Sequence, residues 1–235
     1  MPLSTLFKQL FVFLPYPTES FAGKTVIVTG SNTGLGKEAS RHIARLGATT
    51  LILAVRSLEK GEAAKEDIER TTQCGKDVIK VWHLDMASYS SVLEFVQRSE
   101  RELTRVDVLL ANAAIATLSF AVVEGNESTL TVNVISTFLL ALAMLPKMRE
   151  TAQRFNTSPV VTITSSGAHK DAKFEERSAP EGKLFATMND KQSFDTMQRY
   201  PLSKLLEVFG VKHIGESHPK GQVAINNVNP GFCHS

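Results

Sequence analysis

The 235-residue sequence has only two cysteines, Cys74 and Cys233, and they show neither a disulfide spacing nor a metal-site spacing. Such sparse cysteine use is typical of a reducing compartment, so we expect two free thiols and a cytoplasmic protein. The six histidines form no metal-ligand motif such as His-Glu-x-x-His, and we predict no metal site. A net charge of +2 gives no electrostatic reason to expect binding to nucleic acid or to an anionic membrane.

Long apolar runs are also missing. The run from Phe138 to Leu145 is too short to span a membrane and predicts a buried helix. The run from Leu10 to Leu14 ends at Pro15, and no small-residue cleavage site follows it. We expect residues 1–21 to form an arm packed on the domain surface, with peripheral membrane contact or a role in oligomerisation as the alternatives.

Residues 22–235 are expected to form a single domain, because 43% hydrophobic and 21% charged residues are ordinary for a globular chain. Apolar, β-branched segments predict strands at residues 25–29, 49–55, 78–82, 106–111, 160–164 and 223–228. Helical spacing predicts helices at residues 35–46, 57–71, 88–103, 128–149 (with a kink at Pro146) and 198–216. Residues 167–195 are predicted to be one long polar loop. Alternating strands and helices indicate an α/β fold with a doubly wound (Rossmann) parallel sheet covered on both faces.

A glycine-rich turn follows the first predicted strand directly. Gly30 allows a sharp bend, and Gly34 and Gly36 leave room for backbone amides to approach a pyrophosphate at the start of the next helix. We predict that a dinucleotide contacts the whole turn: Gly30, Ser31, Asn32, Thr33, Gly34, Leu35 and Gly36. The spacing is Gly-x-x-x-Gly-x-Gly rather than Gly-x-Gly-x-x-Gly, so a tight turn without a ligand is the alternative.

The end of the second predicted strand has no carboxylate to bind the ribose hydroxyls of NAD, and the first acidic residue is Glu59. Arg56 instead offers a planar cation to a 2′-phosphate, and Ser57 offers a hydroxyl. We therefore predict NADPH as the cofactor, with a solvated strand-end arginine as the alternative.

Two further strand ends carry candidate cofactor contacts. Asp85 can accept from an adenine amino group, although a helix cap or a solvated turn would have the same sequence. Asn112, Ala113 and Ala114 close the fourth predicted strand and let a cofactor pass closely, with a plain loop start as the alternative.

Tyr200 and Lys204 share one helix face at i, i+4. An ammonium beside a phenol stabilises the phenolate and lowers its pKa, which suits the phenol for acid–base catalysis. Ser165 and Ser166 end the fifth predicted strand and can hold a substrate oxygen, while Asn133 can hold a water that connects Lys204 to solvent. The alternative for the Tyr-x-x-x-Lys pair alone is a solvated helix face.

With these residues the chain resembles the short-chain dehydrogenase/reductase family, in particular its retinol-dehydrogenase-like and fungal secondary-metabolism members. The matching motifs are Thr29-Gly30-x-x-x-Gly34-x-Gly36, Asn112-Ala113-Ala114, Asn133, Ser165-Ser166, Tyr200-x-x-Ser203-Lys204 and Asn229-Pro230-Gly231. The resemblance implies hydride transfer between a nicotinamide and a small carbonyl or alcohol substrate.

By motif position, the resemblance makes Tyr200 the proton donor or acceptor, and it makes Ser166 the residue that orients the substrate. It implies that Lys204 lowers the tyrosine pKa and binds the nicotinamide ribose, and that Asn133 supports a proton relay. It places Pro230 and Gly231 at the cofactor. It also implies a homodimer built by the helices that carry Asn133 and Tyr200.

The sequence departs from the family pattern at three places. Asn112-Ala113-Ala114 replaces the commoner Asn-Ala-Gly, and the stretch between Ser166 and Tyr200 is longer than usual. The sequence ends at Ser235, so we expect the domain to lack the usual last strand and substrate lid. The alternative function is therefore a catalytically weak or inactive NADP(H)-binding scaffold, with weak cofactor binding and an exposed strand edge.

Overall fold

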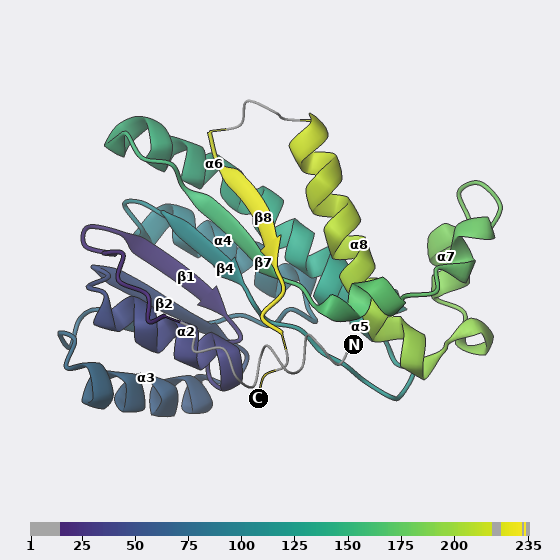
Figure 1. Ribbon diagram of the computed structural model, residues 1–235, viewed down its shortest axis with the longest axis horizontal. Helices are drawn as coiled ribbons and strands as arrows, with labels where there is room; N and C mark the ends of the chain where they lie inside the picture. The colour runs from purple at the N-terminus through teal and green to yellow at the C-terminus, as the bar shows by residue number, and fades with distance from the viewer. Residues whose placement is uncertain (1–14, 218–221, 232, 234–235) are drawn as a thin grey trace.

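The computed structural model describes residues 15–217, 222–231 and 233, and in these residues a parallel sheet forms the centre of the molecule (Figure 1). Its six strands lie in the order β3-β2-β1-β4-β7-β8. Their bounds are β1 Thr25–Thr29, β2 Thr50–Val55, β3 Ile79–His83, β4 Val108–Ala111, β7 Val160–Thr164 and β8 Ala224–Val228. The predicted α/β fold with a doubly wound parallel sheet is thus confirmed.

Helices cover both faces of the sheet because alternate strand residues point to opposite sides. On one side, Val26 and Val28 pack with the apolar residues of α2 (Gly34–Arg45) and α3 (Leu58–Thr72). On the other, Ile27 packs in a cluster with residues of α4 (Tyr89–Glu102), α6 (Thr137–Phe155) and α8 (Thr196–Ser217). All neighbouring strands of the sheet are parallel, so the carboxyl ends of the strands meet at one edge.

The predicted long helix consists of three parts. A turn at α5 (Ser128–Leu130) leads into a π-helix at Thr131–Ser136 and then into α6. Helix α6 continues through Pro146, so the departure from α-helical hydrogen bonding lies upstream of the proline. By length and composition, residues 128–155 could cross a membrane, but 67% of their most apolar window is buried inside the fold. The segment is therefore a core helix, as the sequence predicts.

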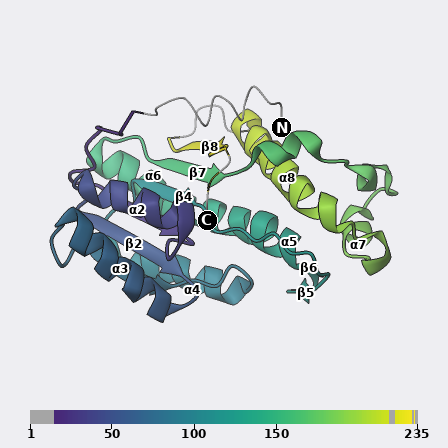
Figure 2. The same cartoon turned by 60° about the horizontal axis from the view of Figure 1, so that its bottom comes forward.

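The long segment after β7 is not one loop. It holds 3₁₀ turns at Gly167–Asp171, Glu175–Ser178 and Lys191–Ser193, and a short helix, α7, at Leu184–Met188. The part around α7 projects away from the sheet (Figures 1 and 2), but Met188 is fully buried with Leu130 and Leu202. This contact fastens the segment to α5 and α8. A small hairpin of β5 (Val122–Val123) and β6 (Asn126–Glu127), which the sequence did not suggest, precedes α5.

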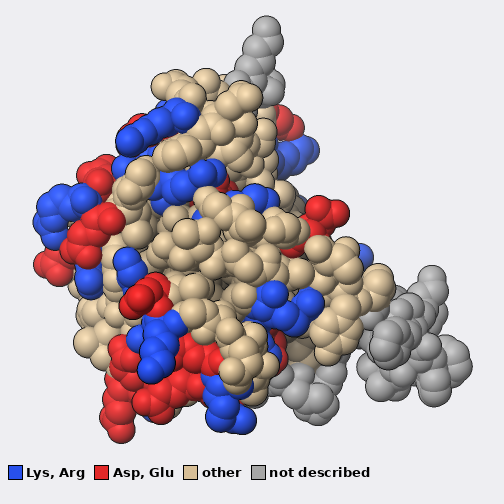
Figure 3. Space-filling view, turned by 90° about the vertical axis from the view of Figure 1, so that its left-hand side faces the viewer, with Lys and Arg blue, Asp and Glu red and all other residues tan. Residues whose placement is uncertain are grey.

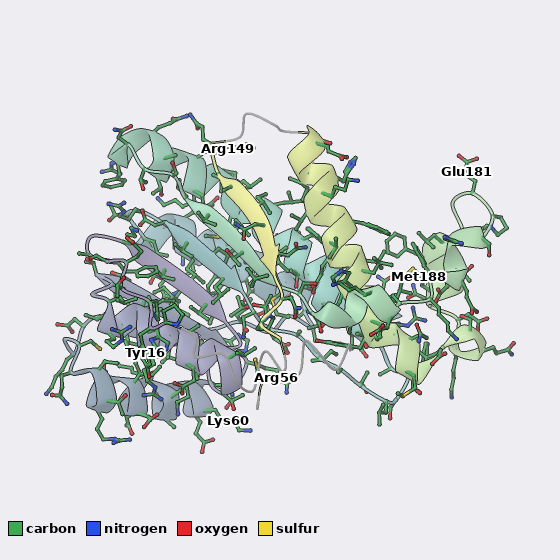
Figure 4. The ribbon with its side chains drawn as sticks, viewed as in Figure 1. Tyr16, Arg56, Lys60, Arg149, Glu181 and Met188 are labelled. Atoms are coloured by element: carbon green, nitrogen blue, oxygen red, sulfur yellow. The ribbon has the colours of Figure 1, made fainter. Side chains whose placement is uncertain are left out.

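Residues 15–21 of the predicted arm lie along the end of α2, and the apolar run from Leu10 to Leu14 lies outside the described residues. The Tyr16 ring meets His42 edge-on, with ring centroids 5.2 Å apart, and Arg45 stacks over it (Figure 4). Arg45 also donates to the Pro17 carbonyl at 2.8 Å. The described part of the arm therefore contacts the end of α2, and its status as a separate arm stays a prediction.

Surface charges of both signs are interspersed, as Figure 3 shows for one side of the molecule. Between α2 and α3, Lys37 and Arg41 of α2 pair with Asp67 of α3 and hold the pKa of its carboxyl well below the usual range. These ion pairs join two neighbouring helices at the surface, where each pair contributes little to stability.

Candidate active site

A cavity of about 750 Å³ opens at the carboxyl ends of the strands, where the strand order reverses between β1 and β4. Ligands of doubly wound sheets bind at such a switch point. Most residues predicted for the site line this cavity: Gly30, Asn32, Thr33, Gly34, Leu35, Arg56, Ser57, Asp85, Asn112, Ala113, Ala114, Ser166, Tyr200, Lys204, Pro230 and Gly231. Segments from both ends of the chain thus meet around one space.

The glycine turn adopts the conformation that its residues allow. Gly30 and Gly34 have φ angles of +64° and +53°, in the left-handed region that favours glycine. A Cβ at Gly36 would lie 2.5 Å from the Gly30 carbonyl oxygen and 2.6 Å from Asn112 Nδ2. The turn therefore needs glycine for its bend at two positions and for close packing at the third.

Helix α2 begins at the cavity wall and leaves its first amides available. Its N-cap residue, Thr33, makes no side-chain capping bond, and Thr33, Gly34 and Leu35 all line the cavity. Uncapped amides at a helix start, together with the helix dipole, form a site for a phosphate group. The residues present thus fit the pyrophosphate of a dinucleotide.

Two residues of the predicted turn support it from behind. Ser31 is fully buried, and its hydroxyl donates to the Val28 carbonyl at 2.9 Å. Neither Ser31 nor Gly36 lines the cavity. Their roles in this structure are to hold the strand-to-helix bend and to bring α2 close to β1.

The Asn112 side chain fastens the end of β4 to the glycine turn. Its Nδ2 donates to the Thr29 carbonyl at 3.1 Å, and the backbone amides of Asn112 and Ala113 each donate to Thr29 Oγ1 at 2.9 Å. A Cβ at Gly30 would lie 2.9 Å from the Ala113 Cα, so the two segments are in close contact. Small residues at this strand end are therefore needed for packing against the glycine turn, independently of any cofactor.

The end of β2 presents two exposed cations to the cavity. Arg56 precedes the N-cap of α3, and Lys60 lies one turn into that helix (Figure 4). Ser57 caps α3, as its hydroxyl accepts from the Lys60 amide at 3.3 Å. The sequence reasoning missed Lys60, which lies in the first turn of α3 and lines the cavity together with Arg56. Together they form a positive corner of the cavity.

Asp85 also lines the cavity, and its carboxylate organises the turn after β3. Oδ1 accepts from the Ala87 amide at 2.9 Å, and the Asp85 amide donates to Ser91 Oγ at 3.0 Å. Asp85 itself thus holds the turn, and its contact with an adenine amino group stays a prediction.

Tyr200 and Ser166 come from two different elements and meet in the cavity. Tyr200 lies in the second turn of α8, and Ser166 caps the 3₁₀ turn after β7, with its hydroxyl accepting from the Ala168 amide at 3.2 Å. The pKa of the Tyr200 phenol is raised: burial raises it most, a hydrogen bond with Ser166 lowers it, and the negative charge of Glu207 raises it. The lowering by Lys204 that the sequence resemblance implies stays a prediction. The pair has the arrangement of an acid–base group beside a hydroxyl that can hold the same oxygen atom.

Lys204 is almost completely buried next to Tyr200. Its Nζ lies 5.6 Å from the centroid of the tyrosine ring and donates to the Thr164 carbonyl at 2.9 Å. The same ammonium forms an ion pair with Glu207 Oε1 at 2.7 Å. Glu207 follows Lys204 by three residues on α8, and sequence reasoning missed it, because an i, i+3 pair on a helix is usually solvent-exposed.

Asn133 lies in the π-helix, is fully buried and does not line the cavity. Its Oδ1 accepts from the Ile115 amide at 2.8 Å, and its Nδ2 donates to the Ile115 carbonyl at 2.9 Å and to Ser203 Oγ at 3.0 Å. Ser203 in turn donates to the Tyr200 carbonyl at 2.8 Å. The side chain therefore links the end of β4 to the helix that carries Tyr200, and the proposed water relay stays a prediction.

Comparison with curated proteins gives fungal relatives over nearly the whole chain. The short chain dehydrogenase/reductase dmxR8 of Cryptosporiopsis is 56% identical over 98% of this chain and 72% of its own length. The short-chain dehydrogenases anuD of Penicillium roqueforti and atnD of Emericella nidulans are each 42% identical, over 99% and 98% of this chain. The chain spans 61% of the anuD length and 74% of the atnD length.

Solved structures share the fold at low sequence identity. A short chain dehydrogenase from Escherichia coli has a TM-score of 0.69 at 22% identity, covering 93% of this chain and 85% of its own. A short chain dehydrogenase from Shigella flexneri, complexed with NADP, has a TM-score of 0.67 at 22% identity, covering 92% and 80%. The family model described as short chain dehydrogenase matches residues 24–175. The site's residues, the fold and these matches agree: the chain belongs to the short-chain dehydrogenase family.

Proposed function

We propose that this chain is an NADP(H)-dependent oxidoreductase that transfers hydride between the nicotinamide and a small carbonyl or alcohol substrate. One observation carries the proposal. Tyr200, Ser166 and Lys204 line the same 750 Å³ cavity as the glycine turn and the uncapped start of α2. A proton-transfer group thus lies within the space that a dinucleotide would occupy.

NADP(H) would be held along this cavity by the turn after β1 and by the start of α2, and the cofactor supplies or accepts the hydride when bound. Arg56 and Lys60 support NADP(H) over NAD(H), because both cations lie at the end of β2, where NAD-binding folds carry a carboxylate. The 2′-phosphate is the group that such a positive corner favours.

In carbonyl reduction, the Tyr200 phenol gives its proton to the substrate oxygen, and Ser166 donates a hydrogen bond to the same oxygen. Lys204 stabilises the phenolate that remains. Alcohol oxidation reverses each step. We take the substrate to be a small organic molecule, and a role in secondary metabolism belongs to the same proposal, because the sequence resembles the fungal secondary-metabolism members of the family and the relatives are fungal short-chain dehydrogenases.

The proposal is tested by NADPH oxidation with a panel of aldehydes and ketones, paired with NADPH binding measured by fluorescence. We expect turnover in the wild type and none in Tyr200→Phe, since only the acid–base proton is removed. Tyr16→Phe is the matched control, because Tyr16 is 67% exposed and does not line the cavity. NADPH binding without turnover on any carbonyl would favour the alternative, a dinucleotide-binding scaffold.

A further inference from the structure

Glu207 is a buried carboxylate whose contacts reach the catalytic pair. Its side chain is 2% exposed, and Oε1 lies 2.7 Å from Lys204 Nζ. Its other oxygen, Oε2, is buried and makes no hydrogen bond of normal geometry among the described residues, although the Ser165 hydroxyl lies near enough to lower the Glu207 pKa. A buried carboxylate with one unpaired oxygen costs stability, so a fold that retains it at this position suggests a function for its charge.

The ammonium of Lys204 has two fixed partners, and neither is Tyr200. Glu207 and the Thr164 carbonyl hold Nζ on the side of α8 that faces β7. The phenol ring centroid is 5.6 Å away, so the ammonium acts on Tyr200 through space. The Glu207 carboxylate lies 2.7 Å from the ammonium and offsets its positive charge. It must therefore weaken the stabilisation of the Tyr200 phenolate by Lys204.

We propose that Glu207 is a positioning residue of this site, which holds the Lys204 ammonium in place and sets how strongly that ammonium stabilises the ionised form of Tyr200. The inference rests on the proposed role of Tyr200 as the acid–base group. With Glu207 ionised, Tyr200 faces an ion pair of no net charge. With a neutral group at position 207, Tyr200 faces an uncompensated cation.

Among the described residues, Glu207 is the negative charge that acts on Tyr200. Strand β7 contributes the Thr164 carbonyl, Ser165 directly after the strand contributes a hydroxyl, and the π-helix contributes the neutral Asn133. The 3₁₀ turn after β7 contributes His169, whose Nδ1 lies 2.7 Å from the Ser166 carbonyl oxygen. Burial raises the pKa of Glu207 to about 7, and the carboxylate is ionised at the higher pH at which a tyrosine titrates.

The test is a phenol titration followed by ultraviolet absorbance, with the Tyr200→Phe variant as the reference that isolates Tyr200. Replacing the carboxylate by the isosteric amide in Glu207→Gln should lower the Tyr200 pKa by about one unit. If the protein oxidises alcohols, its kcat should rise with pH, and the midpoint of that rise should lie at a lower pH in Glu207→Gln by the same amount. Glu216→Gln is the matched control, because Glu216 lies on the same helix with its side chain 66% exposed.

The phenol titration needs no turnover, so it separates this inference from the proposed function. Should Glu207→Gln fail to fold, Glu207→Asp keeps the charge but withdraws it from Lys204, and the Tyr200 pKa should then fall by less than in the amide. A Tyr200 titration unchanged in every folded Glu207 variant, whatever the melting temperature does, overturns the inference. If the Tyr200 titration responds to the Glu207 substitutions as predicted, but the wild type oxidises NADPH with no carbonyl, only the proposed function is refuted.

Discussion

Replacing Glu207 with glutamine should also change how the stability of the protein depends on pH. The residue is 1% exposed, and burial raises its carboxyl pKa from 4.5 to about 7, although the ion pair with Lys204 opposes the rise. An acid whose pKa is higher in the folded state binds more protons when folded, so the free energy of unfolding falls as pH rises through this interval. The ionised carboxyl therefore costs the fold on the order of 3 kcal/mol above pH 7 and nothing below pH 4.5.

Denaturant unfolding of the wild type and Glu207→Gln, from about pH 5 to about pH 8, measures this cost, because the other titrating groups cancel in the difference. We expect the unfolding free energy of the variant, relative to that of the wild type, to rise by about 2 kcal/mol or more from the low to the high end of this pH range. Glu216→Gln, an amide substitution at an exposed position of the same helix, is the control variant. The reasoning would be refuted if the difference in unfolding free energy between Glu207→Gln and the wild type did not change with pH, or if the wild type became the more stable of the two as pH rises.

Three further predictions concern the cofactor, the chemistry and the assembly. Nucleotide titrations should show tighter binding of NADPH than of NADH, and Arg56→Ala should reduce that preference about tenfold. The surface variant Arg101→Ala is the control and should leave the preference unchanged. Equal affinities of the wild type for the two nucleotides would contradict the assignment. Tyr200→Phe should abolish turnover with the NADPH dissociation constant changed by less than about twofold, and an undiminished rate would exclude Tyr200 as the acid–base group. Sedimentation should show a homodimer, because Leu142 on α6 and Phe209 on α8 are 46% and 48% exposed; Leu142→Arg should shift it to monomer, and a wild-type monomer at micromolar concentration would count against the interface.

The inner strands were predictable because they are runs of β-branched and apolar residues. Strands β1 and β7 have the predicted bounds; every residue of β1 is buried, whereas β7 alternates between buried and half-buried residues. A strand buried on two faces must be apolar throughout, and the local sequence reports this directly. The glycine turn was predictable for a similar reason, since its φ angles are a local property.

Features that depend on distant partners were not predictable. Nothing near Asn133 in the sequence shows that its amide group pairs with the backbone of Ile115 and with Ser203. The π-helix around it has no sequence signature of its own. The segment after β7 was read as a loop because its polar composition hides Met188, which pairs with Leu130 and Leu202 only in the folded state.

Helix α8 shows why charge patterns misled the sequence reading of the site. The usual assumption is that charged helix residues face water, but Arg199, Lys204 and Glu207 are each at least 98% buried. Lys204 and Glu207 pair with each other, while Arg199 reaches Glu127 at 3.6 Å. Each burial is tolerable because an opposite charge lies close by, and breaking one such pair leaves an uncompensated charge.

Arg199 gives the buried charges a wider structural consequence. Its guanidinium also lies 3.5 Å from Glu176, which belongs to the segment between β7 and α8. Glu127, its other partner, accepts from the Thr129 and Leu130 amides and so caps the long core helix. One residue next to Tyr200 therefore joins the segment between β7 and α8, and the start of the core helix, to α8.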